Sequence, residues 1–110
     1  MDSPLEYQVV EKENALYLCL KGDLDEQSFL TISRLLSDRK LVQPVKVDLV
    51  GVRYADSTGL RALVLLQRQA QEAGVHFTLL KPSEAVQRVF RSTGLSAIFD
   101  IGSPDPDDPC

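Results

Sequence analysis

The sequence predicts an α/β protein built on a mixed β-sheet, with its elements in the order β-β-α-β-α-β-α. Short apolar segments typical of strands alternate with longer segments whose apolar residues recur at helical spacing. Two of the connections are strand–helix–strand crossovers, which join parallel strands of one sheet. The 110 residues are enough for one domain with a modest hydrophobic core.

The first two strands are expected at residues 7–10 and 15–20. In the second segment every other residue is leucine, which places the leucines on one face of the sheet. The polar residues between the strands suit a hairpin turn, in which Asn14 is able to adopt a positive φ. Gly22 is expected to end the second strand.

The first helix is expected to begin at Asp25, which is a good N-cap residue. It is expected to end near Lys40, whose positive charge suits the negative end of the helix dipole. Between these residues Phe29, Ile32 and Leu36 recur at helical spacing and form an apolar stripe.

The third strand is expected at residues 45–50, where mostly apolar side chains indicate an interior strand covered on both faces. Residues 51–56 form either a loop or a short continuation of that strand. The second helix is expected at residues 57–73, with Gly74 as its C′ residue.

The fourth strand is expected at residues 76–80. Ser83 is the predicted N-cap of the last helix, and Gly94 is expected to end it. Its buried face is expected to contain Val86, Val89 and Phe90, which recur at helical spacing.

The net charge of −4 is concentrated near the C-terminus, because Asp105, Asp107 and Asp108 are three of the 16 acidic residues. The rest of the chain is nearly neutral and has no basic stripe, which argues against direct binding to nucleic acid. The longest apolar run, residues 62–66, is too short to insert across a membrane. The N-terminus lacks the basic-then-apolar pattern of a secretion signal.

Residues 1–102 are predicted to form a single domain and residues 103–110 a flexible, acidic, proline-rich tail. The tail sequence is too polar to be expected to pack. Cys19 and Cys110 make neither a disulfide framework nor a closely spaced metal pair. The reducing cytoplasm is therefore the expected compartment, and the terminal cysteine has no activating neighbours in sequence.

No enzyme site is evident in the sequence. His76 is the only histidine and lies in an expected strand, whereas a general base needs a placed partner. Ser57 lacks the surroundings of a nucleophile elbow, and the glycines do not form a nucleotide-binding loop. No cluster has the spacing of metal ligands. No catalytic residue, metal or cofactor is therefore predicted.

The segment Asp56-Ser57-Thr58-Gly59-Leu60 lies at the junction of the third strand and the second helix. A helix N-terminus offers backbone N–H groups without intrahelical partners and the positive end of the dipole, which suits a phosphate. Ser57 therefore has two interpretations. It is either an N-cap, which stabilises a helix by about 1 kcal/mol, or a hydroxyl that accepts a phosphate. Spacing alone favours the cap.

The wider segment, residues 51–60, resembles the signature of the STAS family, the sulphate transporter and anti-sigma factor antagonist domains. The resemblance extends to three further segments: Gly22-Asp23-Leu24-Asp25, Val47-Asp48-Leu49 and Arg91-Ser92-Thr93-Gly94-Leu95. It covers roughly residues 7–101 in the family's order of elements. The resemblance implies a STAS-like mixed sheet with helices packed mainly on one side.

The resemblance also implies a function, that of an anti-sigma factor antagonist. In such proteins the unphosphorylated form binds an anti-sigma factor and so releases a sigma factor. The anti-sigma factor is also a serine kinase, and it phosphorylates the first hydroxyl of the motif, which is Ser57 here. Thr58 is the minor candidate for the phosphoacceptor. A PPM-type phosphatase reverses the step.

The partner-binding surface implied by the resemblance has six residues: Asp23, Asp56, Ser57, Thr58, Gly59 and Arg61. Many antagonists of the family carry a second glycine where this chain has Arg61. That arginine lies about one turn from Ser57 on the same helix face, where its charge is able to offset a phosphate. It also gives the kinase a different surface to fit.

Two other STAS roles stay open on the sequence. One is a subunit that docks on a transporter ATPase in lipid trafficking, and the other is a component of a stress-sensing assembly. The intact Asp56-Ser57 pair favours the antagonist over the assembly. All three are binding roles, so the protein is not expected to be an enzyme.

Overall fold

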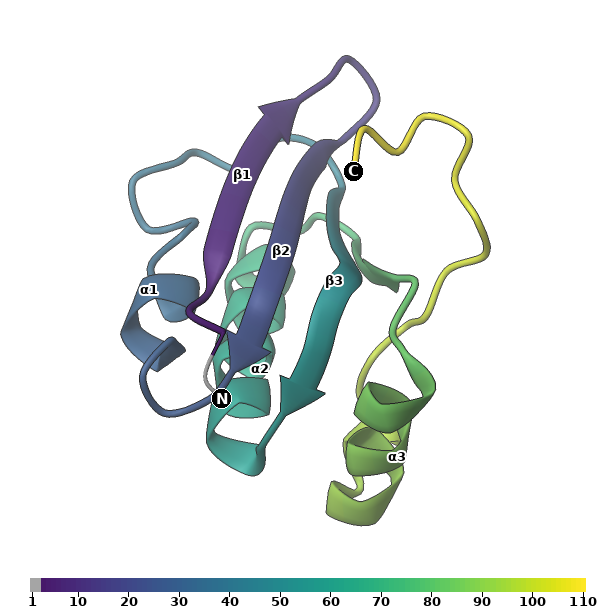
Figure 1. Cartoon of the computed structure of the whole chain (residues 1–110). Coiled ribbons are helices and arrows are strands. Elements are labelled where there is room, and N and C mark those ends of the chain that lie inside the picture. The colour runs from purple at the N-terminus through teal and green to yellow at the C-terminus, as the bar shows by residue number, and fades with distance from the viewer. Residues whose placement is uncertain (1–2) are drawn as a thin grey trace.

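The sheet is mixed, and within residues 3–110, which the computed structural model describes, it has four strands in the order β1-β2-β3-β4 (Figure 1). Strand β1 (Glu6–Glu11) pairs antiparallel with β2 (Leu16–Leu24). Strands β2, β3 (Val45–Ala55) and β4 (Phe77–Leu80) run parallel to one another. The parallel pairs are those joined by crossovers, so the predicted mixed sheet is confirmed.

Helices α1 (Phe29–Ser33), α2 (Ser57–Glu72) and α3 (Glu84–Thr93) bury their apolar residues in one core with the sheet. A 3-10 turn, Leu95–Ala97, follows α3. The sheet side of this core includes alternate residues of three strands: Leu16, Leu18 and Leu20 of β2, Val45, Val47 and Leu49 of β3, and Phe77 and Leu79 of β4. The helices therefore pack on one side of the sheet, and the intervening side chains of the strands point to the opposite face.

Helix α1 is much shorter than the predicted span from Asp25 to Lys40. The side chains and backbones of Asp25 and Ser28 bond one another reciprocally, which makes a turn where the helix was expected to begin. Beyond the helix, the N–H groups of Leu35 and Ser37 bond carbonyls three residues back. These bonds form tight turns rather than continuing the α-helix.

Strand β2 does not end at Gly22, which corrects a second prediction. It continues to Leu24 by pairing with β3, and the register shifts on either side of Gly22 mark a bulge. Gly22 has φ of 106°, and a Cβ there would meet the carbonyl oxygen of Pro4 at 2.5 Å. The glycine is needed because the N-terminal segment crosses the bulge closely. Strand β3 continues through Ala55, so of the two alternatives left open for residues 51–56 the continuation of the strand is the one observed.

The helix ends follow the predicted signals more closely. Ser83 caps α3 by accepting a hydrogen bond from the N–H of Val86 at 3.1 Å. Gly74 and Gly94 both have positive φ just after α2 and α3, as predicted for C-terminal glycines. Asn14, in contrast, does not adopt the positive φ allowed for it; of the described non-glycine residues only Lys81 does.

The last eight residues differ from the predicted solvated tail. Figure 1 shows the chain turning back after α3 so that its C-terminus lies beside the sheet. Cys110 is joined to Cys19 of β2 by a disulfide, and Asp105 is paired with Lys46 of β3. The prediction considered only the polarity of the tail. The tail packs because lysine side chains on and beside the sheet pair with its aspartates. No helix in residues 3–110 is long and apolar enough to cross a bilayer.

Candidate functional site

The candidate site lies at the edge of the sheet where β2 and β3 end. The parallel register places Asp23 opposite Tyr54 and Leu24 opposite Ala55. Helix α2 begins two residues after β3, at Ser57. The end of β2 and the start of α2 are therefore neighbours, and the backbone N–H of Asp56 donates to the carbonyl of Leu24 at 3.0 Å.

The N-cap of α2 is Asp56 and not Ser57, which corrects the capping prediction. Asp56 has an extended backbone, and its Oδ1 accepts a hydrogen bond from the N–H of Gly59 at 2.8 Å. An N-cap is the residue just outside the helix whose side chain satisfies an N–H of the first turn. Because Asp56 fills this role, Ser57 becomes the first helical residue.

Ser57 is left exposed at the helix N-terminus. Its hydroxyl forms no hydrogen bond with any residue in the range 3–110. The first intrahelical donor is the N–H of Leu60, so the N–H groups of Ser57 and Thr58 have no carbonyl partner within the helix. A group attached to the Ser57 hydroxyl would meet a helix terminus whose dipole favours negative charge.

Gly59 allows the start of α2 to approach the end of β2 closely, because it has no side chain. A Cβ at this position would overlap the backbone carbonyl of Leu24 and lie 2.6 Å from the nitrogen of Asp25. The start of α2 is thus pressed against the end of β2 with no room for a methyl group. This contact explains why glycine follows the two hydroxyl residues and fixes Ser57 relative to the β2 edge.

The other residues of the implied surface differ in how far they are exposed to solvent. Thr58 is half-buried, whereas Arg61 is exposed, one turn beyond Ser57. Asp23 is half-buried, and its carboxylate accepts a hydrogen bond from the backbone N–H of Ser3 at 3.1 Å. Asp23 therefore ties the N-terminal segment to the sheet edge and is not a free carboxylate.

The structure adds Tyr54 to the site, which the sequence reasoning did not single out. Its side chain is 52% exposed although it lies in β3, three residues before Ser57. Large exposed apolar residues near polar ones are common at protein interfaces. A groove of about 250 Å³ lies at neighbouring residues of β2 and β3, and its lining includes Asp23, Arg53 and Lys21. The tyrosine in the 51–60 signature was the available signal.

His76 lies far from this arrangement along the strands. It precedes β4, at the opposite end of the parallel strands from Ser57. Its Nε2 contacts the carboxylate of Asp100 at 2.9 Å, and both side chains are largely exposed. The pair is a surface contact, and Ser57 has no histidine beside it to act as a base.

The chain is similar to known proteins along most of its length. A family model described as the Mlab, STAS domain matches residues 7–100, which is most of the chain. The chain belongs to this STAS domain family. Its sequence is 29% identical over 96 residues to the anti-sigma-B factor antagonist of Bacillus subtilis (strain 168), covering 86% of this chain and 88% of that protein.

Solved STAS structures share the fold. The unphosphorylated form of the anti-sigma factor antagonist SpoIIAA superposes with a TM-score of 0.73 at 20% identity, covering 89% of each chain. The phosphorylated form of the Bacillus cell fate determinant SpoIIAA gives a TM-score of 0.67 at 20% identity, covering 89% of this chain and 92% of that one. The STAS fold expected from the sequence is therefore confirmed.

Proposed function

We propose that this STAS protein is an anti-sigma factor antagonist, which binds an anti-sigma factor when unphosphorylated and thereby releases a sigma factor. The proposal is supported by its similarity to the Bacillus subtilis antagonist along most of both chains. It is a binding function and requires no catalytic residue in this chain. We place it in the cytoplasm, where sigma factors act.

The phosphoacceptor in this proposal is Ser57, with Thr58 as the second candidate. The assignment rests on two observations at the start of α2. Asp56 caps the helix, and the Ser57 hydroxyl is exposed and forms no hydrogen bond within residues 3–110. A kinase can therefore reach the hydroxyl without first breaking a structural bond. The half-buried side chain makes Thr58 harder to reach.

Phosphorylation would change the charge of this surface far more than its shape. A phosphate adds about −1.5 to −2 charges next to the carboxylate of Asp56. The helix N-terminus offsets some of that charge, by about 0.3–1 kcal/mol at an exposed site. The guanidinium of Arg61 is one turn away and offsets more. The cap and the packing of Gly59 do not involve the Ser57 side chain, so the fold persists.

The partner would experience the modification differently. A surface complementary to neutral Ser57 and to Tyr54 would face a new charge and the cost of removing water from it. Like charges placed together across an interface cost several kcal/mol. Phosphorylation thus switches binding off. We further propose that the anti-sigma factor is itself the serine kinase and that a PPM-type phosphatase restores the hydroxyl.

A second candidate is docking on a transporter ATPase as a lipid-trafficking subunit. This role is compatible with the matching family, Mlab, STAS domain, whose name does not specify an anti-sigma factor. This role would use the same edge of the sheet and would not require Ser57 to be modified. A gene for a histidine-kinase-like ATPase beside the gene of this protein favours the antagonist, and lipid-transporter genes favour the alternative.

The direct test compares Ser57→Ala and Ser57→Asp in pull-downs with a candidate anti-sigma factor. We expect Ser57→Ala to bind and Ser57→Asp to lose binding, with Ser37→Asp, an exposed serine away from the site, as the control for added charge. In a kinase assay Ser57→Ala should incorporate no phosphate. Equal incorporation in wild type and Ser57→Ala moves the acceptor to another residue, with Thr58→Ala as the next variant.

A further inference from the structure

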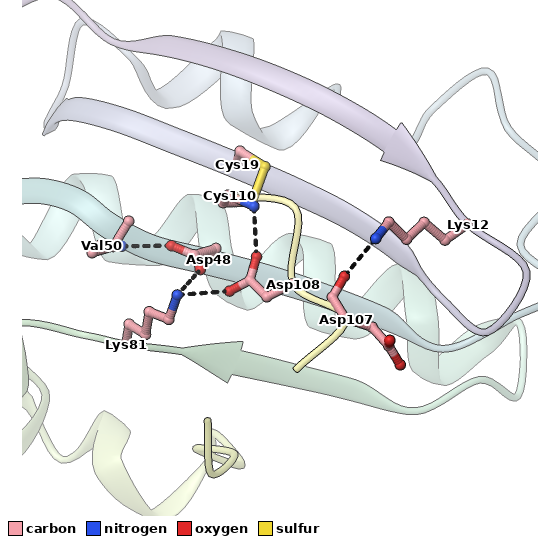
Figure 2. Close-up of a disulfide and its surroundings, with 8 residues drawn as sticks. All are labelled: Lys12, Cys19, Asp48, Val50, Lys81, Asp107, Asp108 and Cys110. Carbon is pink, nitrogen blue, oxygen red and sulfur yellow. Dashed lines mark hydrogen bonds and ion pairs between the residues drawn. A yellow bond between two sulfur atoms is a disulfide. The ribbon is translucent and has the colours of Figure 1, made fainter. Parts of the chain in front are cut away.

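The sheet face that the helices leave open is crossed by residues 103–110, which we call the strap. The strap carries no large apolar side chain: it consists of one serine, three prolines, three aspartates and the terminal cysteine. It is nevertheless held at several points, all on strand residues that point away from the core or on the loops beside them. Figure 2 shows its last residues and their partners on the sheet.

The strap is first held at Asp105. Its Oδ2 accepts a hydrogen bond from the Tyr17 hydroxyl at 2.8 Å and pairs with Nζ of Lys46 at 2.6 Å. The side chain of Asp105 is only 8% exposed. The hydrogen bond from Lys46 is the main reason why its pKa falls to about 2. Burial, reinforced by the same aspartate, raises the pKa of Tyr17 to about 12.

A second contact joins the strap to the turn between β1 and β2. Nζ of Lys12 donates to the backbone carbonyl of Asp107 at 2.8 Å. The side-chain amide of Asn14 donates to the Asp107 carboxylate at 3.1 Å. These contacts are exposed, so water and salt compete with them.

The third contact buries two carboxyl groups. Asp48, in the middle of β3, is fully buried beneath the strap, and Asp108 of the strap is 1% exposed. Nζ of Lys81 lies 3.2 Å from Asp108 and 3.6 Å from Asp48 (Figure 2). Burial raises the pKa of Asp48 to about 6, and the neighbouring carboxyl of Asp108 adds to the rise. The strap therefore determines whether Asp48 meets water.

The strap ends in the disulfide between Cys110 and Cys19, whose Cα atoms are 5.6 Å apart. Cys110 is exposed and Cys19 half-buried. A groove of about 370 Å³ opens beside the bond, and its lining includes both cysteines, Tyr7 and Lys21. The disulfide is thus open to attack by a small thiol, and exposed disulfides tend to be the labile, regulatory ones.

The disulfide differs in kind from the other contacts of the strap. Those contacts are ion pairs and hydrogen bonds. Several of them involve exposed groups, and salt weakens such interactions. The disulfide alone is insensitive to salt and fixes the end of the strap on β2. In a reducing compartment, disulfides are usually transient and serve redox sensing.

We propose that the strap is a thiol–disulfide switch, which closes the open face of the sheet when Cys19 and Cys110 are joined and uncovers it when a dithiol reduces them. The uncovered face presents Tyr17, Lys46 and Lys81 without their strap partners, beside Asp48. This surface is complementary to an acidic segment such as the strap itself. It lies away from Ser57, so the switch is independent of the proposed phosphorylation.

The chemistry balances with a dithiol reductant. One thiolate of the reductant attacks the exposed Sγ of Cys110, the S–S bond breaks, and Cys19 leaves as a thiolate that takes up a proton. The second thiolate attacks the mixed disulfide, and Cys110 leaves and is protonated in turn. Two electrons and two protons pass to the protein, and the reductant becomes a disulfide.

The test uses the full chain, oxidised or reduced with dithiothreitol, at low and high salt. We follow amide hydrogen exchange of Asp107, Asp108 and Cys110 and the NMR titration of the Asp48 carboxyl. Reduction should lower the protection of the strap amides at both salt concentrations, and more at high salt, where the remaining exposed contacts are weaker. It should also move the Asp48 midpoint from about 6 towards its ordinary value of 3.8. Oxidised protein should keep both properties at either salt concentration.

Two variants make the test decisive. Cys110→Ser should behave like the reduced chain and ignore dithiothreitol, with circular dichroism confirming that it is folded. Lys46→Met in the oxidised chain should keep the disulfide and the protection of Asp108. Unchanged exchange and unchanged Asp48 titration after reduction at high salt would overturn the switch. Two freely reactive thiols in protein treated with a mild oxidant would overturn it as well.

Discussion

The start of α2 and the open face of the sheet use polar residues in opposite ways. At α2, backbone contacts and the Asp56 cap satisfy the local structure and leave the hydroxyl of Ser57 unpaired. On the open face, the aspartates of the strap are paired with Lys46 of β3 and with Lys81, which follows β4. The unpaired group is available to another molecule, whereas the paired groups serve the chain itself. A binding partner is therefore better sought at the unpaired Ser57, whereas the paired groups hold the strap on the sheet.

The largest effect on the α2 side is expected from Gly59→Ala. The new methyl group would overlap the carbonyl of Leu24, and separating the two backbones should lower the free energy of unfolding by about 3 kcal/mol. Denaturant unfolding measures the change. The matched control is Gly74→Ala, which has open space around it and should lose only about 1 kcal/mol from its positive φ. Equal losses in the two variants would refute the close approach of α2 and β2.

On the strap side, Asp48→Asn should make stability depend less on pH. The pKa of Asp48 is raised to about 6 in the folded state, so a protonated Asp48 favours folding. The free energy of unfolding of wild type therefore falls as the pH rises from 3.8 through 6. Asparagine cannot ionise, so the free energy of unfolding of the variant should exceed that of wild type at pH 7 by about 2–3 kcal/mol. The difference should vanish near pH 4. Thermal unfolding at both pH values measures it.

The groups that face Asp48 are Asp108 of the strap and Lys81 after β4. Asp48 shifts the pKa of both groups, so Asp48→Asn changes their titration too, and the stability difference reports the three groups together. A stability difference that stays constant between pH 4 and pH 7 would mean that the strap does not keep Asp48 from water.

The smallest effect is expected from Asp56→Ala, which removes the cap of α2. The lost hydrogen bond to Gly59 should lower the free energy of unfolding by about 1 kcal/mol. Asp56→Asn keeps an oxygen acceptor of similar capping strength and should remain close to wild type. The same pair of variants made at Ser57, as Ala and Asn, should leave stability nearly unchanged. A larger loss at Ser57 than at Asp56 would restore the serine as the cap.

Local signals in the sequence accounted for most of the elements. The alternating leucines of β2 and the helical spacing of Val86 and Phe90 predicted buried faces correctly. Ser83 and Gly94 marked the ends of α3 because caps depend on neighbouring residues only. The position of Ser57 at a strand-to-helix junction was also predicted, since both flanking elements have strong patterns.

The failures share a different physical origin. Asp56 and Ser57 are both good caps, and only the backbone conformation decides between adjacent candidates. The bulge at Gly22 depends on Pro4 crossing it, which no local pattern reveals. The disulfide joins residues separated by 91 positions, and the strap is docked by lysines on three separate segments. Such long-range pairing cannot be inferred from the polarity of the tail alone.

The central claim is that charge on Ser57 switches partner binding while the fold stays the same. The most direct measurement is the affinity of the unphosphorylated and phosphorylated full-length protein for the anti-sigma factor, by titration calorimetry with circular dichroism on the same samples. We predict that phosphorylation weakens binding by roughly a hundredfold or more, since 1.4 kcal/mol corresponds to tenfold and like-charge contacts cost several. The spectra should overlay. Equal affinities, or a phosphorylated protein that has lost helix, would contradict the account.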